Sequence, residues 1–332
     1  METEADLEAS LAEPTRELIA MLDDLSGDVA VLGASGKMGP SLVALLSRAG
    51  TAGRRTVFAV SRFSGGNEPR LAGVEAVRAD LLDPTAVRAL PPAPNVIYLV
   101  GQKFGTTGDP GRTWAVNTAI PALVADRYRD SRIVVFSTGN VYPLSDPTSG
   151  GPTESSPTGP VGEYAQSALA REWVFRFYSE RHRTRLAILR INYAIEPRYG
   201  VLRDIGDRVY LGAPIGLAMG HVNVIWQRDA NAIAIRALAH ATIPPLVVNV
   251  TGPIQSVRAI AESFGRRFSR PPVFEGREGA TALLANPARC EGLFGAGEVD
   301  IESMIDRVAA WIVAGGRSLS KPTHFGDRDG RF

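Results

Sequence analysis

The stretch DVAVLGASGKMG, Asp28 to Gly39, joins an apolar strand to the start of a helix. Three glycines, each three residues from the next, follow the strand and lead into the helix. A glycine spacing of this kind indicates nucleotide binding only when it joins a strand to a helix. Gly33 permits a tight turn, Gly36 lets the backbone approach a pyrophosphate, and Gly39 lets the helix pack on the strand. The helix N-terminus adds N–H donors for an anion. The stretch predicts a dinucleotide-binding loop; the alternative is a tight turn without a ligand.

Short apolar runs, many of them β-branched, continue through the first part of the chain and alternate with helical patterns. Their apolarity is continuous rather than alternating, which is typical of a parallel sheet covered on both faces. The sequence therefore predicts an α/β fold, a doubly wound parallel sheet of the Rossmann type. We expect strands at 28–32, 56–60, 74–77, 95–100, 132–136 and 185–189, and helices at 38–48, 84–90, 114–128 and 164–183.

After Leu189 the pattern is less regular, and we expect the Rossmann body to be interrupted by a smaller substrate lobe. The Pro-, Gly-, Ser- and Thr-rich stretch 145–162 predicts a surface loop. The expected parts are a dinucleotide-binding domain at 27–192 plus about 222–253, and a substrate lobe at about 193–221 plus 254–320. A helical extension at 1–26 and a tail at 321–332 flank them.

The composition is that of a globular chain: 332 residues, 45% hydrophobic and 21% charged. The formal net charge of +1 creates no field that draws nucleic acid or an anionic membrane. The acidic N-terminal segment lacks the basic start of a secretory signal. No apolar run reaches the roughly 18 to 20 residues of a membrane helix. We expect a cytoplasmic protein whose partner is a small-molecule substrate, with no nucleic acid and no membrane.

Cysteine and histidine usage argues against disulfide and metal chemistry. The single Cys290 excludes an internal disulfide and is interpreted as a buried small apolar residue rather than a nucleophile. The four histidines are scattered, with no HxxxH or CxxC spacing. No metal site is therefore expected.

The second predicted strand ends in Ser61-Arg62, where a cofactor without a 2'-phosphate is usually held by an acidic residue. The Arg62 guanidinium would pair with a 2'-phosphate, and Lys37 would add a second positive charge. NADP(H) is thus favoured over NAD(H); the alternative is that Arg62 is a solvated surface residue. Asp80 and Leu81, after the third strand, are placed to flank the adenine. Ser35 and Met38 complete the cofactor residues of the glycine loop.

Three further segments follow the glycine loop in order: DLLDP (Asp80 to Pro84), STGNVY (Ser137 to Tyr142) and EYAQSALARE (Glu163 to Glu172). With the glycines, this order resembles the extended short-chain dehydrogenase/reductase family, the NAD-dependent epimerases and dehydratases. The resemblance covers about Gly27 to Gly316, including LRINYAIEP, VNVIWQRDANAI and VNVTGP. It is specific for the fold and not for the substrate, because the family spans nucleotide-sugar epimerases, dehydratases, and ketone and aldehyde reductases.

The resemblance implies catalytic roles for two hydroxyl groups. Thr138 would hydrogen-bond the substrate oxygen, and Tyr164 would exchange a proton with that oxygen as general acid/base. A phenol whose pKa lies near 10 is a poor base at neutral pH, so the family uses a lysine to lower it. One turn after Tyr164, where that lysine would stand, this chain has Ala168.

Two basic residues are candidates for the missing charge. Arg171 lies on roughly the same helical face as Ala168, although it is also interpreted as a solvated helix residue. Lys103 lies in the loop GQKFGTTG, Gly101 to Gly108, where the switch-point rule places ligands. The chain has only three lysines, Lys37, Lys103 and Lys321. Lys103 would stand near Tyr164 or clamp an anionic substrate; the alternative is a surface lysine.

The remaining candidates follow from their positions in the resemblance. Asn117 and Asn192-Tyr193 fall where the family contacts the nicotinamide half of the cofactor, and Gly101 borders the same crevice. For both asparagines the alternative is capping or turn formation. Asn140, Tyr142 and Tyr193 would line the substrate side. The C-terminal HFGDRDGRF would pack against a neighbouring lobe or subunit.

Two function classes remain open. The first is an NAD(P)-dependent oxidoreductase or epimerase that acts on a sugar or related polyhydroxylated carbonyl compound and uses Tyr164 and Thr138. The second, favoured by Ala168, is a non-catalytic NADP(H)-binding redox sensor or regulatory protein. A third route is oxidation by the cofactor without a tyrosine base. The resemblance also makes a homodimer possible.

Overall fold

The computed structural model describes residues 3–51, 54–103, 105, 108–321 and 323–330. Several residues of predicted segments lie outside this range. They are Met1 and Glu2 of the N-terminal extension, Phe104, Thr106 and Thr107 of the loop after the fourth strand, and Pro322, Arg331 and Phe332 of the tail.

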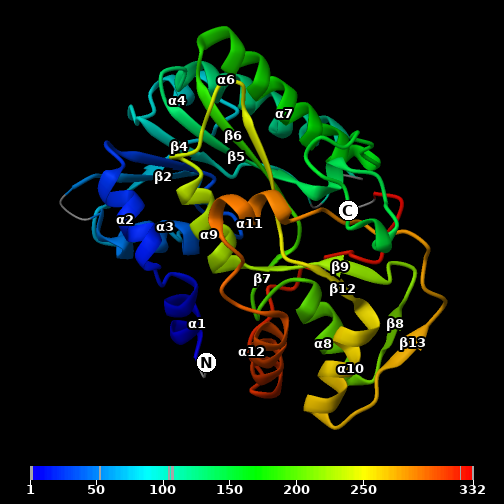
Figure 1. Ribbon diagram of the computed structural model, residues 1–332. Coiled ribbons are helices and arrows are strands. Elements are labelled where there is room, and N and C mark those ends of the chain that lie inside the picture. Colours follow the sequence, from blue (N-terminus) through cyan, green and yellow to red (C-terminus); the bar gives the residue numbers. More distant parts are fainter. Residues whose placement is uncertain (1–2, 52–53, 104, 106–107, 322, 331–332) are drawn as a thin grey trace.

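A seven-stranded sheet forms the centre of the larger part of the molecule (Figure 1), in the order β11-β6-β5-β4-β1-β2-β3. All neighbouring strands pair in parallel. The strands are β1 (Val29–Leu32), β2 (Val57–Ser61), β3 (Val74–Arg78), β4 (Asn95–Tyr98), β5 (Arg132–Thr138), β6 (Arg185–Ile191) and β11 (Leu246–Val250). The order reverses between β1 and β4, so the loops after these two strands border one crevice. The predicted doubly wound α/β fold is confirmed.

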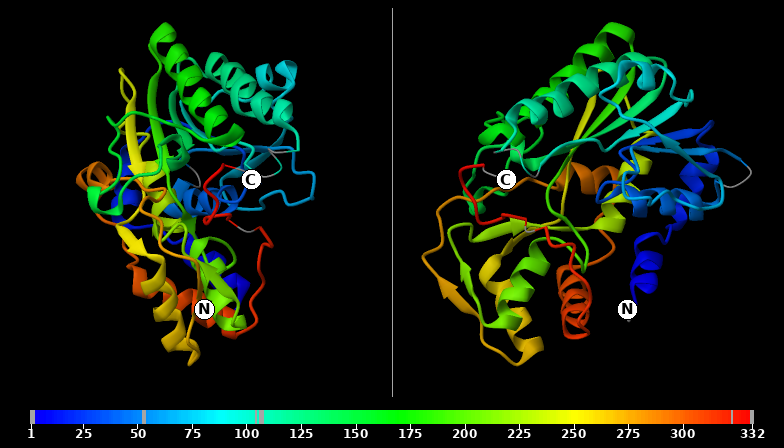
Figure 2. Two further views of the ribbon diagram at one scale, coloured as in Figure 1. Left: turned by 90° about the vertical axis from the view of Figure 1, so that its right-hand side faces the viewer. Right: turned by 180° about the vertical axis from the view of Figure 1, so that it is seen from behind.

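Helices cover both faces of this sheet (Figure 2), which explains why β1 and β4 are buried at every residue. One face carries α2 (Arg16–Asp24), α3 (Gly39–Leu46), α9 (Gln227–Arg236) and α11 (Ala288–Phe294). The other carries α4 (Pro84–Arg88), α6 (Ile120–Arg127) and α7 (Gly162–His182). An irregular turn, Ser47–Thr51, follows α3, and α5 (Pro110–Trp114) runs through a π-helical stretch, Ala115–Ala119, into α6.

The smaller lobe lies beside the carboxyl end of the sheet (Figure 1) and has its own apolar core. Its helices are α8 (Val201–Leu211), α10 (Val257–Phe268) and α12 (Ile301–Val313). Its short strands pair as β7 (Ala194–Ile195) with β10 (Ile225–Trp226), β9 (His221–Asn223) with β12 (Ile254–Ser256), and β8 (Pro214–Gly216) with β13 (Val273–Glu275). Leu202, Phe264 and Ile305 pack together from the three helices and join the fully buried Trp226.

Two segments pack against a different part of the molecule from the one that the sequence predicts for them. The N-terminal residues are not a separate extension, because α1 (Glu4–Leu11) buries Leu7 and Leu11 in the core of the smaller lobe, and α2 packs on the sheet. Helix α11 lies within the range assigned to the substrate lobe, yet it buries Cys290 and Phe294 against the sheet. Burial raises the pKa of the Cys290 thiol to about 12, in keeping with a packing role.

The C-terminal tail runs back across the molecule from the smaller lobe to the start of α7 (Figure 2). Thr323 is buried and donates from its N–H (2.8 Å) and its hydroxyl (2.5 Å) to Asp204 of α8. Phe325 enters the core of the smaller lobe. Gly330 packs so closely on Val161 that a Cβ would lie 2.2 Å from the Val161 carbonyl oxygen. The tail therefore connects the smaller lobe to the helix that carries Tyr164.

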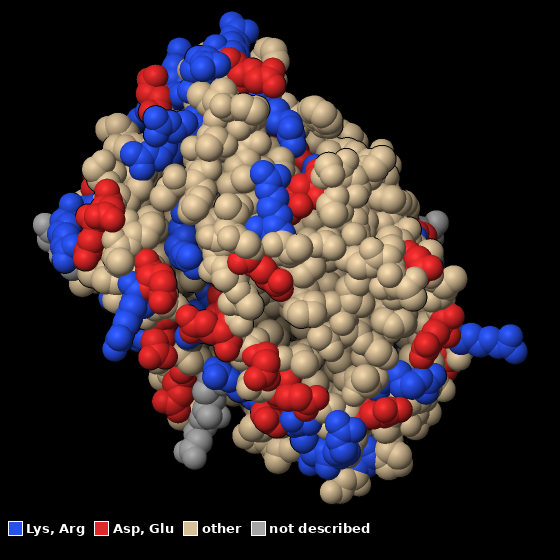
Figure 3. Space-filling view, viewed as in Figure 1, with Lys and Arg blue, Asp and Glu red and all other residues tan. Residues whose placement is uncertain are grey.

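Charged side chains of both signs are interspersed on the face seen in Figure 3. A broad area without charged side chains lies to the right of the centre in this view. Within the described part of the chain, no helix combines the length and the apolar character needed to cross a bilayer.

Candidate active site

The glycine loop forms a tight turn between β1 and α3. Gly33 has a φ of +93°, and a Cβ there would lie 3.1 Å from the backbone nitrogen of Val100. At Gly39 a Cβ would lie 2.3 Å from the carbonyl oxygen of Ala34, so only glycine lets the helix start this close to the loop. Gly36 is exposed, and a Cβ there would approach only the carbonyl oxygen of Gly33. The turn thus leaves its backbone open on the side of the crevice.

We call the hollow beside this turn the cofactor crevice; it has a volume of about 460 Å³. Eight of the predicted cofactor residues line it: Gly33, Ser35, Gly36, Ser61, Arg62, Asp80, Leu81 and Gly101. The Ser35 and Ser61 hydroxyls are hydrogen-bonded to each other, and Arg62 is exposed at the same edge. Arg112, from α5, also lines the crevice and was missed by sequence reasoning. The volume of the crevice, the turn formed by the three glycines and the polar side chains at its edge fit a dinucleotide.

Lys37 does not line the cofactor crevice, although the sequence predicts it there. Its ammonium donates to the carbonyl oxygen of Ala194 at 2.6 Å and lies 3.5 Å from the centre of the Tyr199 ring. It lines a second cavity rather than the cofactor crevice. The expectation that Lys37 supports a 2'-phosphate is therefore corrected, because its contacts with Ala194 and Tyr199 hold the ammonium in the second cavity.

We call the second cavity the reaction cavity; it has a volume of about 210 Å³. Nine predicted residues meet here from different parts of the chain: Lys37, Met38, Gly101, Lys103, Thr138, Asn140, Tyr164, Asn192 and Tyr193. Gly39 is buried beside the turn. The two cavities share Leu99, Gly101 and Lys103. A ligand in the crevice would therefore border directly on the cavity.

The Thr138 hydroxyl is oriented by Asn140. It donates to Asn140 Oδ1 at 3.0 Å and accepts from the Asn140 N–H at 3.2 Å, in the turn that follows β5. Tyr164 is half-buried near the start of α7, and its ring lies 5.8 Å from the Lys103 ammonium. Lys103 also lies 3.5 Å from the carbonyl oxygen of Thr323 in the tail. Burial lowers the pKa of Lys103 to about 8, with Asp204 opposing that shift.

Arg171 is not a solvated residue of α7, since it is only 4% exposed. One guanidinium nitrogen donates to the carbonyl oxygens of Val100, just after β4, and Phe136, near the carboxyl end of β5, each at 3.0 Å. A Cβ at Gly101 would lie 2.9 Å from that nitrogen, so this glycine makes room for the guanidinium. Arg171 lines the reaction cavity, whereas Ala168 is fully buried in the helix packing.

Tyr142 does not line the substrate side, and that expectation is corrected. It is buried, with its hydroxyl donating to Asn249 at 2.8 Å and accepting from Arg190 at 2.7 Å. Arg190 forms an ion pair with Glu172 at 2.8 Å, which is buried on both sides. Glu172 also accepts from the Ser137 hydroxyl. These groups form a polar network beneath the cavity, and burial raises the pKa of Tyr142.

The two predicted asparagines behave differently. Asn117 is fully buried and holds the loop after β4, exchanging hydrogen bonds with the backbone of Gln102 and donating to the Ser167 hydroxyl at 2.9 Å. It does not reach either cavity, which corrects its assignment as a cofactor contact. Asn192 lines the reaction cavity, and its Nδ2 is buried with no hydrogen-bond partner among the described residues.

Tyr199, missed by sequence reasoning, joins Tyr193 on the small-lobe side of the reaction cavity. Burial raises the pKa of both phenols. Tyr193 has a φ of +45°, a strained value for a non-glycine residue, as the chain turns from the sheet toward the smaller lobe. No spacing in the sequence marks Tyr199, because its role arises from the Lys37 ammonium that lies on its ring.

The glycine turn, the switch-point crevice and the hydroxyl pair agree with a comparison against protein-family models. Residues 29–204 match the model described as the NAD dependent epimerase/dehydratase family. The chain belongs to this family. The family is one of enzymes that use a nicotinamide dinucleotide, and the resemblance inferred from the sequence is thereby confirmed. A search of curated proteins finds no match.

Solved structures of other proteins share the fold. An epimerase, Mth375, from Methanothermobacter thermautotrophicus is 16% identical, with a TM-score of 0.72, and the match covers 90% of this chain and 96% of that one. The UDP-glucose 4-epimerase of Thermus thermophilus, in complex with NAD, is 20% identical, with a TM-score of 0.70 and coverages of 85% and 98%. Bordetella bronchiseptica WbmG, in complex with NAD and UDP, is 18% identical, with a TM-score of 0.71 and coverages of 90% and 99%.

Proposed function

We propose that the protein is an NAD(P)-dependent oxidoreductase or epimerase that acts on a hydroxyl or carbonyl carbon of a sugar or related polyhydroxylated compound. The observation that carries this proposal is the convergence of Thr138 and Tyr164 on a cavity that shares a wall with the cofactor crevice. A non-catalytic binding site has no physical need for two hydroxyls at that junction.

The cofactor is held by the glycine turn, by Ser61 and Arg62 after β2, and by Asp80 and Leu81 after β3. We propose NADP(H) as the preferred form, because an arginine stands where an acidic residue would accept the ribose hydroxyls of NAD(H). Arg112 adds a second cation to the crevice. When bound, the nicotinamide supplies a hydride acceptor or donor at the substrate carbon.

In this proposal Tyr164 exchanges the proton of the substrate oxygen, and Thr138 donates a hydrogen bond to the same oxygen. For this bond the threonine hydroxyl turns its one proton from Asn140 Oδ1 to the substrate oxygen, while the Asn140 N–H continues to donate to the hydroxyl. Lys103 replaces the lysine absent at Ala168, because its ammonium lies 5.8 Å from the centre of the Tyr164 ring. Arg171 positions the backbone after β4 and near the end of β5 through its two carbonyl contacts.

The test combines cofactor binding with turnover. Fluorescence titration would give dissociation constants for NADPH and NADH, and absorbance of the reduced nicotinamide would follow a panel of sugars and sugar acids. The proposal expects tight NADPH binding and turnover of at least one compound, lost in Tyr164→Phe and reduced in Thr138→Ala. If neither nucleotide binds, the proposal fails.

The second candidate is a redox sensor that binds NADP(H) without chemistry. Ala168 favours it, because Arg171, the cation that follows on that face of α7, donates to backbone carbonyl oxygens. This candidate predicts cofactor binding that is unchanged in Tyr164→Phe, no turnover of any compound in the panel, and a change in assembly or shape between the oxidised and reduced cofactor.

We also propose a homodimer formed through α5 and α7. Trp173 and Phe177 lie one turn apart on α7 and are 61% and 56% exposed, with Trp114 of α5 also exposed. A Trp173→Glu, Phe177→Glu double variant should be a monomer by light scattering while the wild type is a dimer. A monomeric wild type would refute the proposal.

A further inference from the structure

The reaction cavity is unusually rich in positive charge. Lys37, Lys103 and Arg171 line it, whereas no aspartate or glutamate does so among the residues that the structure describes. Two of the three lysines in the whole chain are placed here. Because charges attract strongly where water is largely excluded, a cavity lined by three cations and, among the described residues, no acid is electrostatically suited to an anion.

The Lys37 ammonium is directed into this cavity by two contacts. It donates to the Ala194 carbonyl oxygen at 2.6 Å, and the Tyr199 ring supports it at 3.5 Å. An ammonium has three N–H donors, so these contacts leave capacity for a ligand. Lys37 lines only the reaction cavity and not the crevice in which the glycine turn lies. The residue is therefore suited to the substrate rather than to the cofactor.

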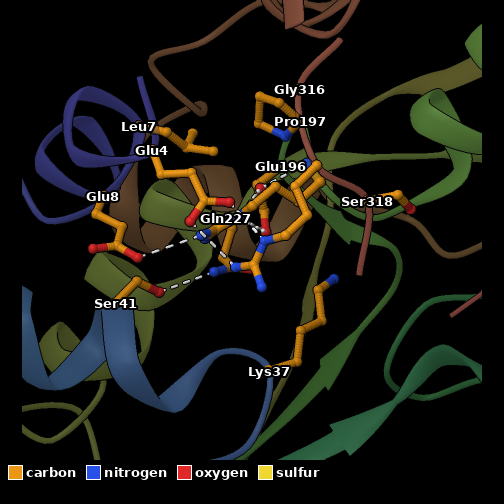
Figure 4. Close-up of polar contacts among 12 residues, drawn as sticks. Glu4, Leu7, Glu8, Lys37, Ser41, Glu196, Pro197, Gln227, Gly316 and Ser318 are labelled. Carbon is orange, nitrogen blue, oxygen red and sulfur yellow. Dashed lines mark hydrogen bonds and ion pairs between the residues drawn. The ribbon is translucent and has the colours of Figure 1, made fainter. Parts of the chain in front are cut away.

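The carboxylates nearest to the two lysines already have other partners. Glu196 receives Arg198 Nε at 3.1 and 3.2 Å and the Arg198 N–H at 2.8 Å. Figure 4 shows Lys37 extending from the loop before α3 toward the segment that carries Glu196. Asp204 accepts both donors of Thr323. These acids moderate the charge of the lysines without occupying the cavity.

Two buried donors in the cavity wall lack acceptors. Asn192 is 2% exposed and Arg171 4% exposed, and neither Asn192 Nδ2 nor Arg171 Nε has a hydrogen-bond partner among the described residues. A buried donor without an acceptor costs about 1–3 kcal/mol. Both atoms have almost no accessible surface, so an acceptor oxygen of a ligand would reach them only after the surrounding side chains shift. The charge of the cavity therefore comes from the lysines and the guanidinium.

We propose that Lys37 and Lys103 bind a carboxylate of the substrate, so that this enzyme acts on an acidic carbonyl or hydroxyl compound such as a sugar acid, not on a neutral sugar. The inference rests on the proposed function. The cavity of about 210 Å³ is below the roughly 300–1000 Å³ of ordinary ligand pockets. It suits one small charged group at the reacting end of a molecule, held close to Thr138 and Tyr164.

The test compares two ligands that differ only in charge, D-glucuronate and its neutral amide, D-glucuronamide. Isothermal titration calorimetry near pH 6.5 should show at least tenfold tighter binding of the anion by the wild type, and the smaller pair lactate and lactamide should show the same order. Lys37→Met and Lys103→Met should each weaken glucuronate binding about tenfold or more and leave glucuronamide binding unchanged. Lys321→Met, at the exposed third lysine, should bind glucuronate as the wild type does.

Equal affinity for acid and amide would overturn the inference, as would the absence of binding of both anions at millimolar concentration. An effect of Lys321→Met as large as that of Lys37→Met would also overturn it, because the charge would then act from a distance. NADPH titration of Lys37→Met should match the wild type within about twofold; a large loss would assign Lys37 to the cofactor instead. Glucuronate binding that persists in an inactive Tyr164→Phe variant separates this inference from the proposed chemistry.

Discussion

The cofactor crevice and the reaction cavity share a wall, yet they are built in different ways. The crevice is formed mainly by short runs that follow β1, β2, β3 and β4, with Arg112 from α5, and its centre is a backbone turn. The reaction cavity takes Lys37, Tyr164 and Tyr199 from segments far apart in the chain, and its character comes from charged and phenolic side chains. A site formed mainly by backbone groups is determined by the local sequence of its turn. A site formed mainly by side chains depends on how distant segments of the chain pack together.

The largest expected effect is the loss of activity when the hydroxyl of Tyr164 is removed from the reaction cavity. Removal of the Tyr142 hydroxyl, in the buried network, should not cause this loss. Tyr164→Phe should lower kcat/KM by about 10²- to 10⁴-fold, because it removes the proton-exchanging group. The dissociation constant for NADPH should stay within about twofold of wild type, since the crevice is unchanged. Steady-state kinetics and fluorescence titration measure the two quantities.

The matched control is Tyr142→Phe, which removes a buried hydroxyl bonded to Asn249 and Arg190. Its unfolding free energy should fall by about 1–3 kcal/mol, with kcat/KM near that of wild type. A folded Tyr142→Phe protein as inactive as Tyr164→Phe would contradict the assignment of Tyr142 to the underlying network.

The next largest effect concerns the floor of the reaction cavity. Glu172→Ala leaves the Arg190 guanidinium buried without its anion, and the free energy of unfolding in urea should fall by about 3–5 kcal/mol. Glu68→Ala breaks an exposed ion pair with Arg78 and should leave the urea midpoint nearly unchanged. Equal effects of the two variants would show that the buried pair is not structurally important.

A smaller effect, on cofactor binding alone, is expected when Arg62 of the cofactor crevice is replaced. Arg62→Ala should weaken NADPH binding roughly 10- to 100-fold, because the 2'-phosphate loses a charge-assisted contact, and should change NADH binding less than about twofold. Arg78→Ala, at the end of β3 but outside the crevice lining, is the control. A wild type that binds NADH as tightly as NADPH would remove the proposed preference.

The smallest effect is the pH dependence of anion binding in the reaction cavity. Burial lowers the pKa of Lys37 to about 7 and that of Lys103 to about 8. The charged ammonium exists below these values and binds the anion, so glucuronate affinity should fall by at least about tenfold between roughly pH 6 and pH 9. Calorimetry at both pH values measures it, and a double Lys37→Met, Lys103→Met variant should show a flat profile.

Other titratable groups face these lysines. Glu196 and Asp204 oppose the pKa shift of Lys37, and the raised pKa values of Tyr193 and Tyr199 keep both phenols neutral over this range. Tyr164 faces Lys103. Affinity that rises with pH in the wild type would contradict the binding of the anion by protonated lysine.

The sheet and the crevice were largely predictable from the sequence. Continuous apolar runs identify strands covered on both faces, because neither face meets water. The spacing of Gly33, Gly36 and Gly39 identifies the turn, because close backbone approach there excludes a Cβ, as at Gly39. The smaller lobe was harder to divide, since α1 and α11 each pack on a core that their position in the chain does not indicate.

The sequence by itself determined the parallel sheet, the glycine turn and the presence of Thr138 at the end of β5 and of Tyr164 near the start of α7. Only the tertiary structure decided where the long charged side chains point. Lys37 bonds to a carbonyl oxygen 157 residues away, Arg171 bonds to the backbone after β4 and near the end of β5, and Tyr142 is enclosed by Arg190 and Asn249. A long side chain has many rotamers of similar energy, and the partner that selects one of them is brought close only when distant segments fold together.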